Sequence, residues 1–422
     1  MHLHLDFEGE ITDPIHRSIR FTGAERDIID SPVFQRLRRI RQLAGAHLVY
    51  PSAQHSRFEH SLGAMHVAGL AGESLLAKGH IDNADVVQEL RLAALLHDIG
   101  HGPFSHLFEE VLETKTSTSH EEIGRRIIAK SEIADALSKN GYSADHIAGL
   151  SFGQSKTGFL NEIISGGLSA DIMDYLPRDA YFTGAEYGKV DYYRLVSSFE
   201  VAKGRLAIDR SALNSLESML ISRYEMFKAV YFHKTVRSAE VMLLQSMIAG
   251  DDELGLSDTS LDNYLSLTDE ATLERLCALQ GIAGRLARDY RDRRLLKCVY
   301  ERFLHKRERN KRMDRKALSK MEEEIAQTAG VDRSLVFADA SRASSMPLTP
   351  SKQEMSFVLV ADKTGVQEVP VSDIPLVDSI SGFFDMLRIY TTAESRQKVE
   401  RSVKKVLGEK ETLGIGAGRH GR

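Results

Sequence analysis

Apolar residues recur with a helical period from about residue 28 to about residue 249. Within this stretch hydrophobic positions fall three or four residues apart, prolines are few, and the runs break at Gly or Ser. Residues 5–22 look more extended, and the turn-forming pair Asp13-Pro14 lies among them, so a short hairpin is expected there. The pattern predicts a mainly α-helical fold.

The second half of the chain is more varied. Gly250–Asp258 is rich in Gly, Asp and Ser and marks the first expected boundary, after which Leu261–Gln327 returns to a helical pattern. Residues 302–320 carry nine Lys or Arg against two acidic residues. Such a run can be a solvated helical face, or it can contact a phosphate-rich ligand or an acidic partner.

The C-terminal part predicts strands as well as helices. Residues 341–353 have the composition of a loop, and Met355–Ala361 and Val366–Val371 are expected to pair as a hairpin with Gly365 in the turn. Helices are expected over Ser379–Tyr390 and Ala393–Leu407. We therefore predict a helical core, a basic helical extension, a small α+β module and a loose tail, over residues 1–250, 251–330, 331–407 and 408–422.

Composition is that of a soluble globular protein: 422 residues, 42% hydrophobic and 27% charged. No apolar run approaches the ~20 residues of a membrane span, and the N-terminus lacks the layout of a signal peptide. Two cysteines exclude a disulfide scaffold and favour the cytoplasm. A net charge of −5 does not suit a protein that coats nucleic acid, so a nucleic-acid partner is unsupported. Sixteen histidines are the unusual feature.

One histidine continues an apolar helical stripe. Val86, Leu90, Ala93 and His97 are spaced 4, 3 and 4, so they share a face, and Asp98 follows directly. A lone inward histidine is more often a satisfied core residue than a ligand. A neighbouring buried carboxylate changes that balance, because it needs a compensating partner. Imidazole plus carboxylate suits a divalent ion of the Mn, Fe, Co, Ni or Zn series.

Further candidate ligands lie on other predicted helices. His60 precedes an apolar helix, and Asp171 shares a helical face with Asp174, Tyr175 and Arg178. Three more histidines follow the His-Asp pair, namely His101, His106 and His120. Ser119 and Glu122 could form a capping box that places His120 in a first helical turn. Imidazoles beside a metal suit phosphate-ester cleavage, since they donate to phosphate oxygens or transfer a proton near neutral pH.

The ordered set His60, His97-Asp98 and Asp171 is the H…HD…D signature of HD-domain metal-dependent phosphohydrolases. The chain resembles the SAM-and-HD-domain dNTP triphosphohydrolase family and its microbial relatives over roughly residues 5–250, with no counterpart of the SAM domain. The strings that carry this resemblance are Asp30–Leu43, Ser56–Gly63, His97–His106, Asp171–Asp179 and Arg223–Lys234. It implies an HD-domain helical core that hydrolyses a deoxynucleoside triphosphate to nucleoside and triphosphate.

The resemblance also implies roles for individual residues. His60, His97, Asp98 and Asp171 would bind one divalent ion per subunit, such as Mn, Fe, Ni, Zn or Mg, and further Mg could arrive with the nucleotide. The expected catalytic and phosphate-contacting residues are His101, His106, Glu109, His120 and Glu121, with Glu121 orienting His120. The expected substrate contacts are Gln42, Leu43, Arg57, Tyr175, Asp179, Arg223 and Tyr231. Arg223 and Tyr231 lie about two helical turns apart and could touch opposite ends of a nucleotide.

A regulatory GTP or dNTP site at a subunit contact would involve Asp30, Gln35 and Arg38, in a homo-oligomer to which the basic segment 302–320 also contributes. The alternative is that Gln35, Arg36, Arg38, Arg39 and Arg41 form a solvated helical face.

Two departures from the family pattern concern the substrate. Ile172 replaces a lysine that pairs with the triphosphate, and Phe227 replaces a base-side histidine. Two other functions therefore stay open: an HD phosphatase or phosphodiesterase acting on monophosphates or other phosphate esters, and a nucleotide- or nucleic-acid-binding sensor.

Overall fold

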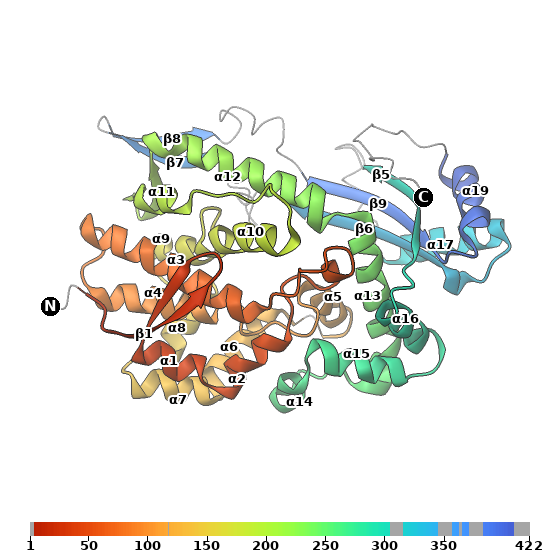
Figure 1. The fold of residues 1–422 in the computed structure, drawn as a ribbon, viewed down its shortest axis with the longest axis horizontal. Coiled ribbons are helices and arrows are strands. Elements are labelled where there is room, and N and C mark those ends of the chain that lie inside the picture. Colours follow the sequence, from red (N-terminus) through yellow and green to blue (C-terminus); the bar gives the residue numbers. More distant parts are fainter. Residues whose placement is uncertain are drawn as a thin grey trace.

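A computed structural model describes residues 4–116, 118–303, 315–344, 357–362, 365–370 and 383–408. Figure 1 shows a body of helices with small sheets at its periphery. The helices are α1 (Gly23–Ile29), α2 (Pro32–Gln35), α3 (Arg57–Ala77), α4 (Ala84–Leu96), α5 (His106–Lys115), α6 (His120–Lys130), α7 (Glu132–Lys139), α8 (Ala144–Ser151), α9 (Gly158–Ser165), α10 (Ala170–Thr183), α11 (Tyr192–Ser197), α12 (Leu213–Met226), α13 (Lys234–Leu254), α14 (Leu261–Ser266), α15 (Asp269–Ala278), α16 (Gly281–Arg291), α17 (Arg315–Ala329) and α19 (Arg396–Leu407). The strands are β1 (Phe7–Asp13), β2 (Arg17–Thr22), β3 (Phe199–Ala202), β4 (Arg205–Asp209), β5 (Lys297–Phe303), β6 (Val336–Ser344), β7 (Phe357–Asp362), β8 (Gly365–Pro370) and β9 (Phe383–Thr391). The prediction of a mainly helical fold with a small strand-containing C-terminal part is confirmed.

The predicted N-terminal hairpin is present, because β1 and β2 pair antiparallel. Asp13 forms the turn: its Oδ1 accepts from the backbone N–H groups of Ile15 and His16 at 2.9 and 2.8 Å. Thr22 ends the hairpin and starts α1 through a capping box with Glu25. The turn thereby holds His16 at a fixed place against the helical core.

Helices α3, α4 and α10 form the part of the core that carries the site. Ser56 and Glu59 make a capping box that starts α3, and Asn83 caps α4 by accepting from Val86 N. Helix α10 approaches α3 closely at Gly63, where a Cβ would lie 1.8 Å from Asp174 Oδ1. Glycine is therefore required at this crossing, and it lets a carboxylate of α10 reach the first turns of α3.

The C-terminal sheet has β9 at its centre, antiparallel to β5 and β6. Helices α17 and α19 pack on it, with Leu387 and Ile389 in their common core. The predicted helix Ser379–Tyr390 is therefore wrong over Phe383–Tyr390, and residues 379–382 lie outside the described part. A short apolar run has no periodicity that distinguishes a buried strand from a buried helix. Residues Met386–Tyr390 of this strand are all buried, so both faces are covered there, and Tyr390 lies in the main core.

Three other expectations for this region need correction. The helical pattern assigned to Leu261–Gln327 contains strand β5, and residues 304–314 of its basic segment lie outside the described ranges. Helix α13 runs past the boundary expected at residue 250. Strand β6 extends to Ser344, so the expected loop begins later, and its residues 345–353 are not described.

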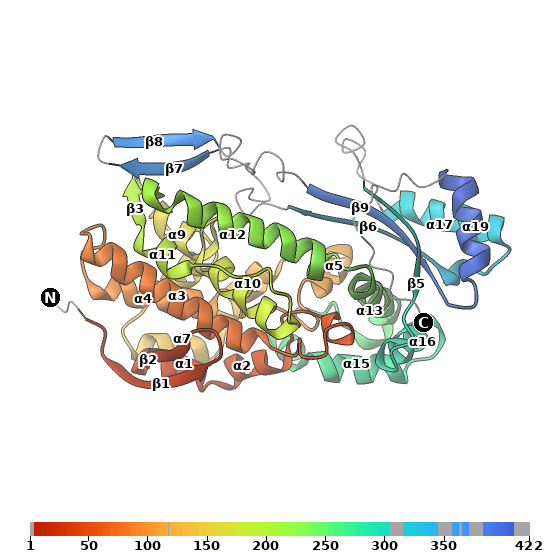
Figure 2. The same ribbon diagram turned by 45° about the horizontal axis from the view of Figure 1, so that its top comes forward.

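The predicted hairpin of β7 and β8 is present, but it belongs to another sheet. The sheet order is β3-β4-β7-β8, and β4 pairs parallel with β7 through Ile208 and Val360. Figure 2 shows β7 and β8 beside α12, far from α17 and α19. The packing therefore groups residues differently from the predicted module 331–407. Residues 363–364 of the turn and 409–422 of the expected tail lie outside the description. Among the described helices, none is long and apolar enough to cross a bilayer.

Candidate metal and catalytic site

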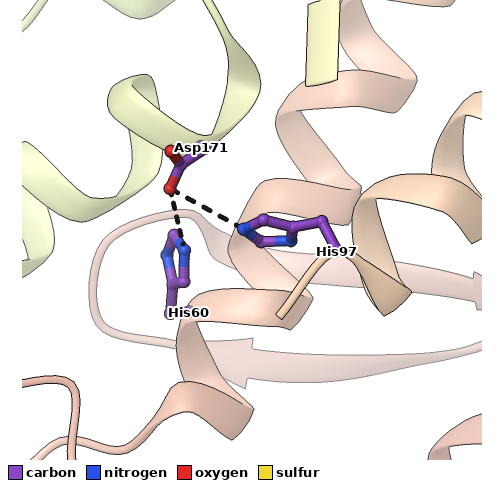
Figure 3. A group of neighbouring side chains, drawn as sticks. All are labelled: His60, His97 and Asp171. Carbon is purple, nitrogen blue, oxygen red and sulfur yellow. Dashed lines mark ion pairs between the residues drawn. The ribbon is translucent and has the colours of Figure 1, made fainter. Parts of the chain in front are cut away.

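Three side chains from three helices converge on one point (Figure 3). His60 lies in the first turn of α3, His97 caps the end of α4, and Asp171 lies in the first turn of α10. Asp171 Oδ1 is 3.1 Å from His60 Nε2 and 3.7 Å from His97 Nε2. The structure thus brings together residues that are far apart in the sequence.

Asp98 borders the same point. Its Oδ1 is 3.4 Å from His97 Nε2, and its Oδ2 is 3.5 Å from His60 Nε2. The carboxylate also pairs with the guanidinium of Arg57. Burial opposes ionisation, but Arg57 and the neighbouring histidines hold the pKa of Asp98 well below its ordinary value. All four residues predicted as ligands are therefore neighbours, and Asp98 is ionised.

The two imidazoles present the same nitrogen to this point. His60 Nδ1 donates to Asp174 Oδ2 at 2.8 Å, and His97 Nδ1 donates to Ala94 O at 2.6 Å. These contacts leave the lone pairs on both Nε2 atoms, which are buried and lack a hydrogen-bond partner among the described residues. Fixing a ligand histidine through its other nitrogen is the usual arrangement at metal sites.

A divalent ion fits this donor set. Ligand atoms held about 2.0–2.2 Å from one ion lie roughly 3 to 3.5 Å apart, close to the separations among His60, His97 and Asp171. Two imidazoles with carboxylates suit the series from Mn to Zn. Burial alone would lower the pKa of His60, but the neighbouring carboxylates of Asp171, Asp174 and Asp98 raise it to about 10. A proton and a divalent ion therefore compete for Nε2 of His60.

Asp174 connects His60, one of the two candidate ligand histidines, to the N-terminal hairpin. Besides His60, it accepts from His16 Nε2 at 2.6 Å and from two nitrogens of Arg178 at 2.8 and 2.9 Å. Arg178 also donates to Asp13 at 2.8 Å. All these side chains are buried. The turn of the hairpin therefore supports the orientation of a candidate ligand.

A second cluster is centred on Glu109, on α5. Its carboxylate lies 3.5 Å from His101 Nδ1 and 3.4 Å from His106 Nδ1, and it pairs with His120 Nδ1. The rings of His101 and His120 stack with centroids 4.2 Å apart. Although burial opposes it, His106 and His120 hold the pKa of Glu109 well below its ordinary value. The cluster combines an anion with imidazoles that can carry protons.

His97 and Asp171 line a cavity of about 210 Å³ together with His101, His106 and His120. His60 and Glu109, which contact these residues, are not among the lining residues. His101 Nε2 lies 3.3 Å from Asp98 Oδ1, which joins the two groups. Arg57 donates through Nε to Ser105 Oγ at 2.7 Å and lines the cavity beside Asp98. The lining residues are Gln42, Arg57, His97, Asp98, His101, His106, His120, Glu121, Ser151, Phe152, Ser165, Asp171 and Tyr175.

The expectation that Glu121 orients His120 is wrong for this geometry. Ser119 caps α6 by accepting from Glu122 N, which places His120 in the first turn as predicted. The carboxylate at His120 Nδ1 is that of Glu109. Glu121 is exposed and lines the cavity. Residues in a first turn fan out around the helix axis, so adjacency in sequence did not bring Glu121 onto the ring.

The predicted substrate contacts divide into two groups. Gln42, Arg57 and Tyr175 line the cavity, whereas Leu43, Asp179, Arg223 and Tyr231 are not among its lining residues. Asp179 is 2% exposed and accepts from Tyr231 OH at 2.6 Å and His55 Nε2 at 2.7 Å. Leu43 packs against the hydrophobic core.

Arg223 and Tyr231 do not share one regular helix. Helix α12 ends at Met226, and Phe227–Tyr231 forms a π-helical segment. Arg223 lies 5.8 Å from the ring centroid of Tyr175, and the rings of Tyr231 and Tyr175 are 6.4 Å apart. Both side chains therefore flank Tyr175, and their contact with opposite ends of a nucleotide stays a prediction.

The residues expected at a regulatory site lie outside this cavity. Asp30 is exposed after α1, and Arg38 donates to Gln35 Oε1 at 2.7 Å while stacking over Phe58. The alternative of a wholly solvated face is wrong for Arg36, which is 2% exposed. Its guanidinium donates to the carbonyl oxygen of His101 at 2.9 Å and to those of Leu267 and Tyr264.

Sequence reasoning missed two supporting histidines, His16 and His55. Each is buried and pairs with an aspartate of α10. An isolated histidine in a hairpin turn or a loop carries no periodic signal. Asp174 was within reach of sequence reasoning, because it shares a helical face with Asp171.

Comparisons with known proteins agree with this geometry. A family model of the HD domain matches residues 57–178, and one of the HD-associated region matches residues 190–413. An uncharacterized protein of Methanocaldococcus jannaschii is 38% identical over 63% of this chain and 57% of its own length. Human deoxynucleoside triphosphate triphosphohydrolase SAMHD1 is 29% identical over 65% of this chain and 51% of its own. The chain thus spans little more than half the length of these relatives.

Solved structures cover nearly the whole chain. A hypothetical protein from Aquifex aeolicus aligns with a TM-score of 0.75 and 31% identity, over 94% of this chain and 100% of that one. A phosphohydrolase from Bacteroides thetaiotaomicron shares the fold, with a TM-score of 0.73, 24% identity, and coverage of 91% and 99%. With the HD-associated match over more than half of the sequence, these findings show that the chain belongs to the HD-domain phosphohydrolase family.

Proposed function

We propose that this protein is a metal-dependent deoxynucleoside triphosphate triphosphohydrolase that releases nucleoside and intact triphosphate. The observation that supports it most is one cavity lined by His97, Asp98 and Asp171, by Arg57 and by three further histidines, with His60 grouped beside His97 and Asp171. His60, His97, Asp98 and Asp171 would hold the ion. Relatives named deoxynucleoside triphosphate triphosphohydrolase, among them human SAMHD1, support the same substrate class.

When bound, a divalent cation in this site would polarise a phosphoryl oxygen and lower the pKa of a water molecule. Arg57 lies beside Asp98 in the cavity wall, where its positive charge can bind phosphate oxygens. Burial, Arg57 and His120 keep the pKa of His101 well below its ordinary value, so this ring is neutral and can donate a hydrogen bond without adding charge.

The Glu109 cluster suits proton transfer to the leaving group. Glu109 faces the Nδ1 atoms of His106 and His120. Although burial opposes it, the carboxylate of Glu109 raises the pKa of His106. His106 is the most exposed of the cluster, with 73% of its side chain accessible, so it can meet an incoming substrate. In the proposed reaction, water bonds to the α-phosphorus, the bond from phosphorus to the 5′-oxygen breaks, and His106 gives that oxygen a proton. The proton that the water loses then restores the protonated form of His106.

The substrate end of the site lies around Tyr175. Gln42 and Tyr175 line the cavity and would contact the sugar, with Asp179 and Tyr231 behind them. Ile172 is 5% exposed, so the position of the family's lysine adds no charge here. Arg223 supplies a cation instead: burial lowers its pKa only to about 10, and its Nε is buried without a hydrogen-bond partner among the described residues.

The decisive experiment is a substrate panel. Purified protein with Mn or Mg would be incubated with NTPs, dNTPs and monophosphates, and the products separated by ion exchange. Inorganic triphosphate supports the proposal, whereas orthophosphate or a nucleoside monophosphate identifies an HD phosphatase or phosphodiesterase. Replacing His97-Asp98 by Ala-Ala separates the enzyme from a nucleotide sensor. The enzyme then loses metal and turnover, and a sensor keeps its ligand.

Regulation by nucleotides is a second part of the proposal. Arg38 and Gln35 form an exposed hydrogen-bonded pair next to Asp30, which could bind GTP or a dNTP at a contact between subunits of a homo-oligomer. Addition of millimolar GTP or dNTP should change activity or oligomeric mass, and Arg38→Ala should remove the response. No change in either quantity would contradict this part alone.

A further inference from the structure

Asp269 is a buried carboxylate outside the matched HD domain. It is the first residue of α15 and is 1% exposed. Its Oδ1 accepts from the backbone N–H of Phe104 at 2.8 Å, and its Oδ2 accepts from that of Arg41 at 3.0 Å. One side chain of the HD-associated region thus holds two backbone segments of the N-terminal half.

Both segments lead directly into the cavity. Arg41 precedes the lining residue Gln42, and Phe104 and Ser105 precede His106. Phe104 and Ser105 have φ angles of 59° and 56°, which residues other than glycine rarely adopt. Backbone of this kind persists only where its surroundings fix it. Asp269 is one of the groups that fix it.

Ser105 closes the arrangement into a ring. Its Oγ donates to the carbonyl oxygen of Arg41 at 2.9 Å and accepts from Arg57 Nε at 2.7 Å. The two segments held by Asp269 are therefore also bonded to each other. Arg57 in turn pairs with Asp98. Direct hydrogen bonds therefore connect the Asp269 carboxylate, through the Arg41 and Phe104–Ser105 backbone, to Arg57 in the cavity wall.

We infer that Asp269 is a positioning residue, which sets the Phe104–Ser105 backbone and the Gln42 segment for the proposed hydrolysis. The inference rests on the proposed function for its effect on turnover. It gives the HD-associated region a defined part in the site, since α15 lies in that region. Asp269 itself lies outside the residues that line the cavity.

The charge environment agrees with a role in position. Burial raises the pKa of Asp269 to about 6. The hydrogen bonds from the backbone N–H groups of Phe104 and Arg41, and the charge of Arg41, act in the opposite direction and lower this pKa. Glu270, Arg36 and Tyr290 are the other ionisable groups that act on it electrostatically. The folded state binds this proton more tightly than an unfolded Asp does. Protonation of Asp269 therefore raises the free energy of unfolding as pH falls from about 6 toward 4. At neutral pH the ionised carboxylate therefore costs stability.

The test compares Asp269→Asn with Asp251→Asn. Asp251 is also buried and accepts two hydrogen bonds, both from Ser257, but it lies away from the lining residues. In Asp269→Asn one acceptor becomes a donor facing an N–H group. We expect kcat/KM to fall by about 10- to 100-fold while bound metal is unchanged. Amide exchange should quicken over residues 100–106, and an acid limb of the wild-type profile near pH 6 should disappear.

The control variant should keep wild-type kcat/KM and wild-type exchange over residues 100–106. Equal kcat/KM in Asp269→Asn and wild type, or an equal loss in both variants, would overturn the inference. If the wild-type protein hydrolyses none of the nucleotides, the proposed function fails, and exchange over residues 100–106 still decides whether Asp269 fixes this backbone. If Asp269→Asn does not fold, Asp269→Ser gives the same comparison, because its single hydroxyl cannot accept from both the Phe104 and the Arg41 N–H groups.

Discussion

His60 donates from Nδ1 to Asp174 Oδ2 across 2.8 Å, which turns its Nε2 toward Asp171. A ligand histidine is thus oriented by a carboxylate that is itself held by Arg178 and by His16 of the N-terminal hairpin. This relationship links the candidate metal site to a part of the chain outside the matched HD domain.

Asp174→Asn should weaken metal binding by about 10- to 100-fold, because the amide cannot accept every bond that the carboxylate accepts. Calorimetric titration of metal-free protein with Mn measures this directly. Asp179→Asn is the matched control: Asp179 is a buried aspartate of the same helix paired with His55. It should leave Mn affinity unchanged. Equal Mn affinity in Asp174→Asn and wild type would contradict the role.

Glu109→Gln should lower kcat by about 100- to 10,000-fold, since the protonated form of His106 loses its anionic partner and His120 loses the carboxylate at its Nδ1. Single-turnover assays with saturating dNTP measure the chemical step. Glu110→Gln is the control on the same helix, because Glu110 lies 3.7 Å from Arg237 instead. Metal content should stay at the wild-type level in both variants.

Arg223→Gln should raise KM for the triphosphate by about 10-fold with a smaller effect on kcat, because a charged hydrogen-bond donor is removed from the substrate end. Steady-state kinetics separate the two constants. The exposed Arg194 provides the control, with Arg194→Gln expected to match wild type. A fall in kcat at constant KM would assign Arg223 to the reacting end of the site.

Acid should destabilise the fold through His66. Burial, and to a smaller extent the charges of His16 and Arg91, lower the pKa of His66 to about 3. Unfolding lets this ring bind a proton near its ordinary value of 6.5, so its contribution is complete above that pH and declines as pH falls toward 3. Tm of wild type should drop over this window. His66→Gln should show a shallower decline, and parallel curves for the two proteins would refute the assignment.

Most helices, and the helices that present His97 and Asp171, could be predicted from the sequence because their apolar periodicity is a strong local signal. The stripe ending at His97 predicted the helix that presents this residue, and the face shared by Asp171 and Asp174 predicted their common orientation. The sequence could not predict which carboxylate contacts His120. Glu109 and Glu121 are both candidates, and only the packing of α5 against α6 decides between them.

Strand β9 shows where local pattern fails. Met386–Tyr390 is apolar except for Arg388, and every one of these residues is buried, so neither a period of two nor one of 3.6 stands out. Arg388 donates through Nε to Glu301 and through Nη2 to the carbonyl oxygen of Phe232, partners that are distant in sequence. Only the assembled sheet explains this segment.

The parallel pairing of β4 with β7 has a consequence for synthesis of the chain. Strand β4 leaves the ribosome about 150 residues before its partner, so its edge stays open while the helices between them are made. An open strand edge attracts other chains. Nascent or C-terminally shortened chains should therefore self-associate through Arg205–Asp209 until Phe357–Asp362 arrives to cover it.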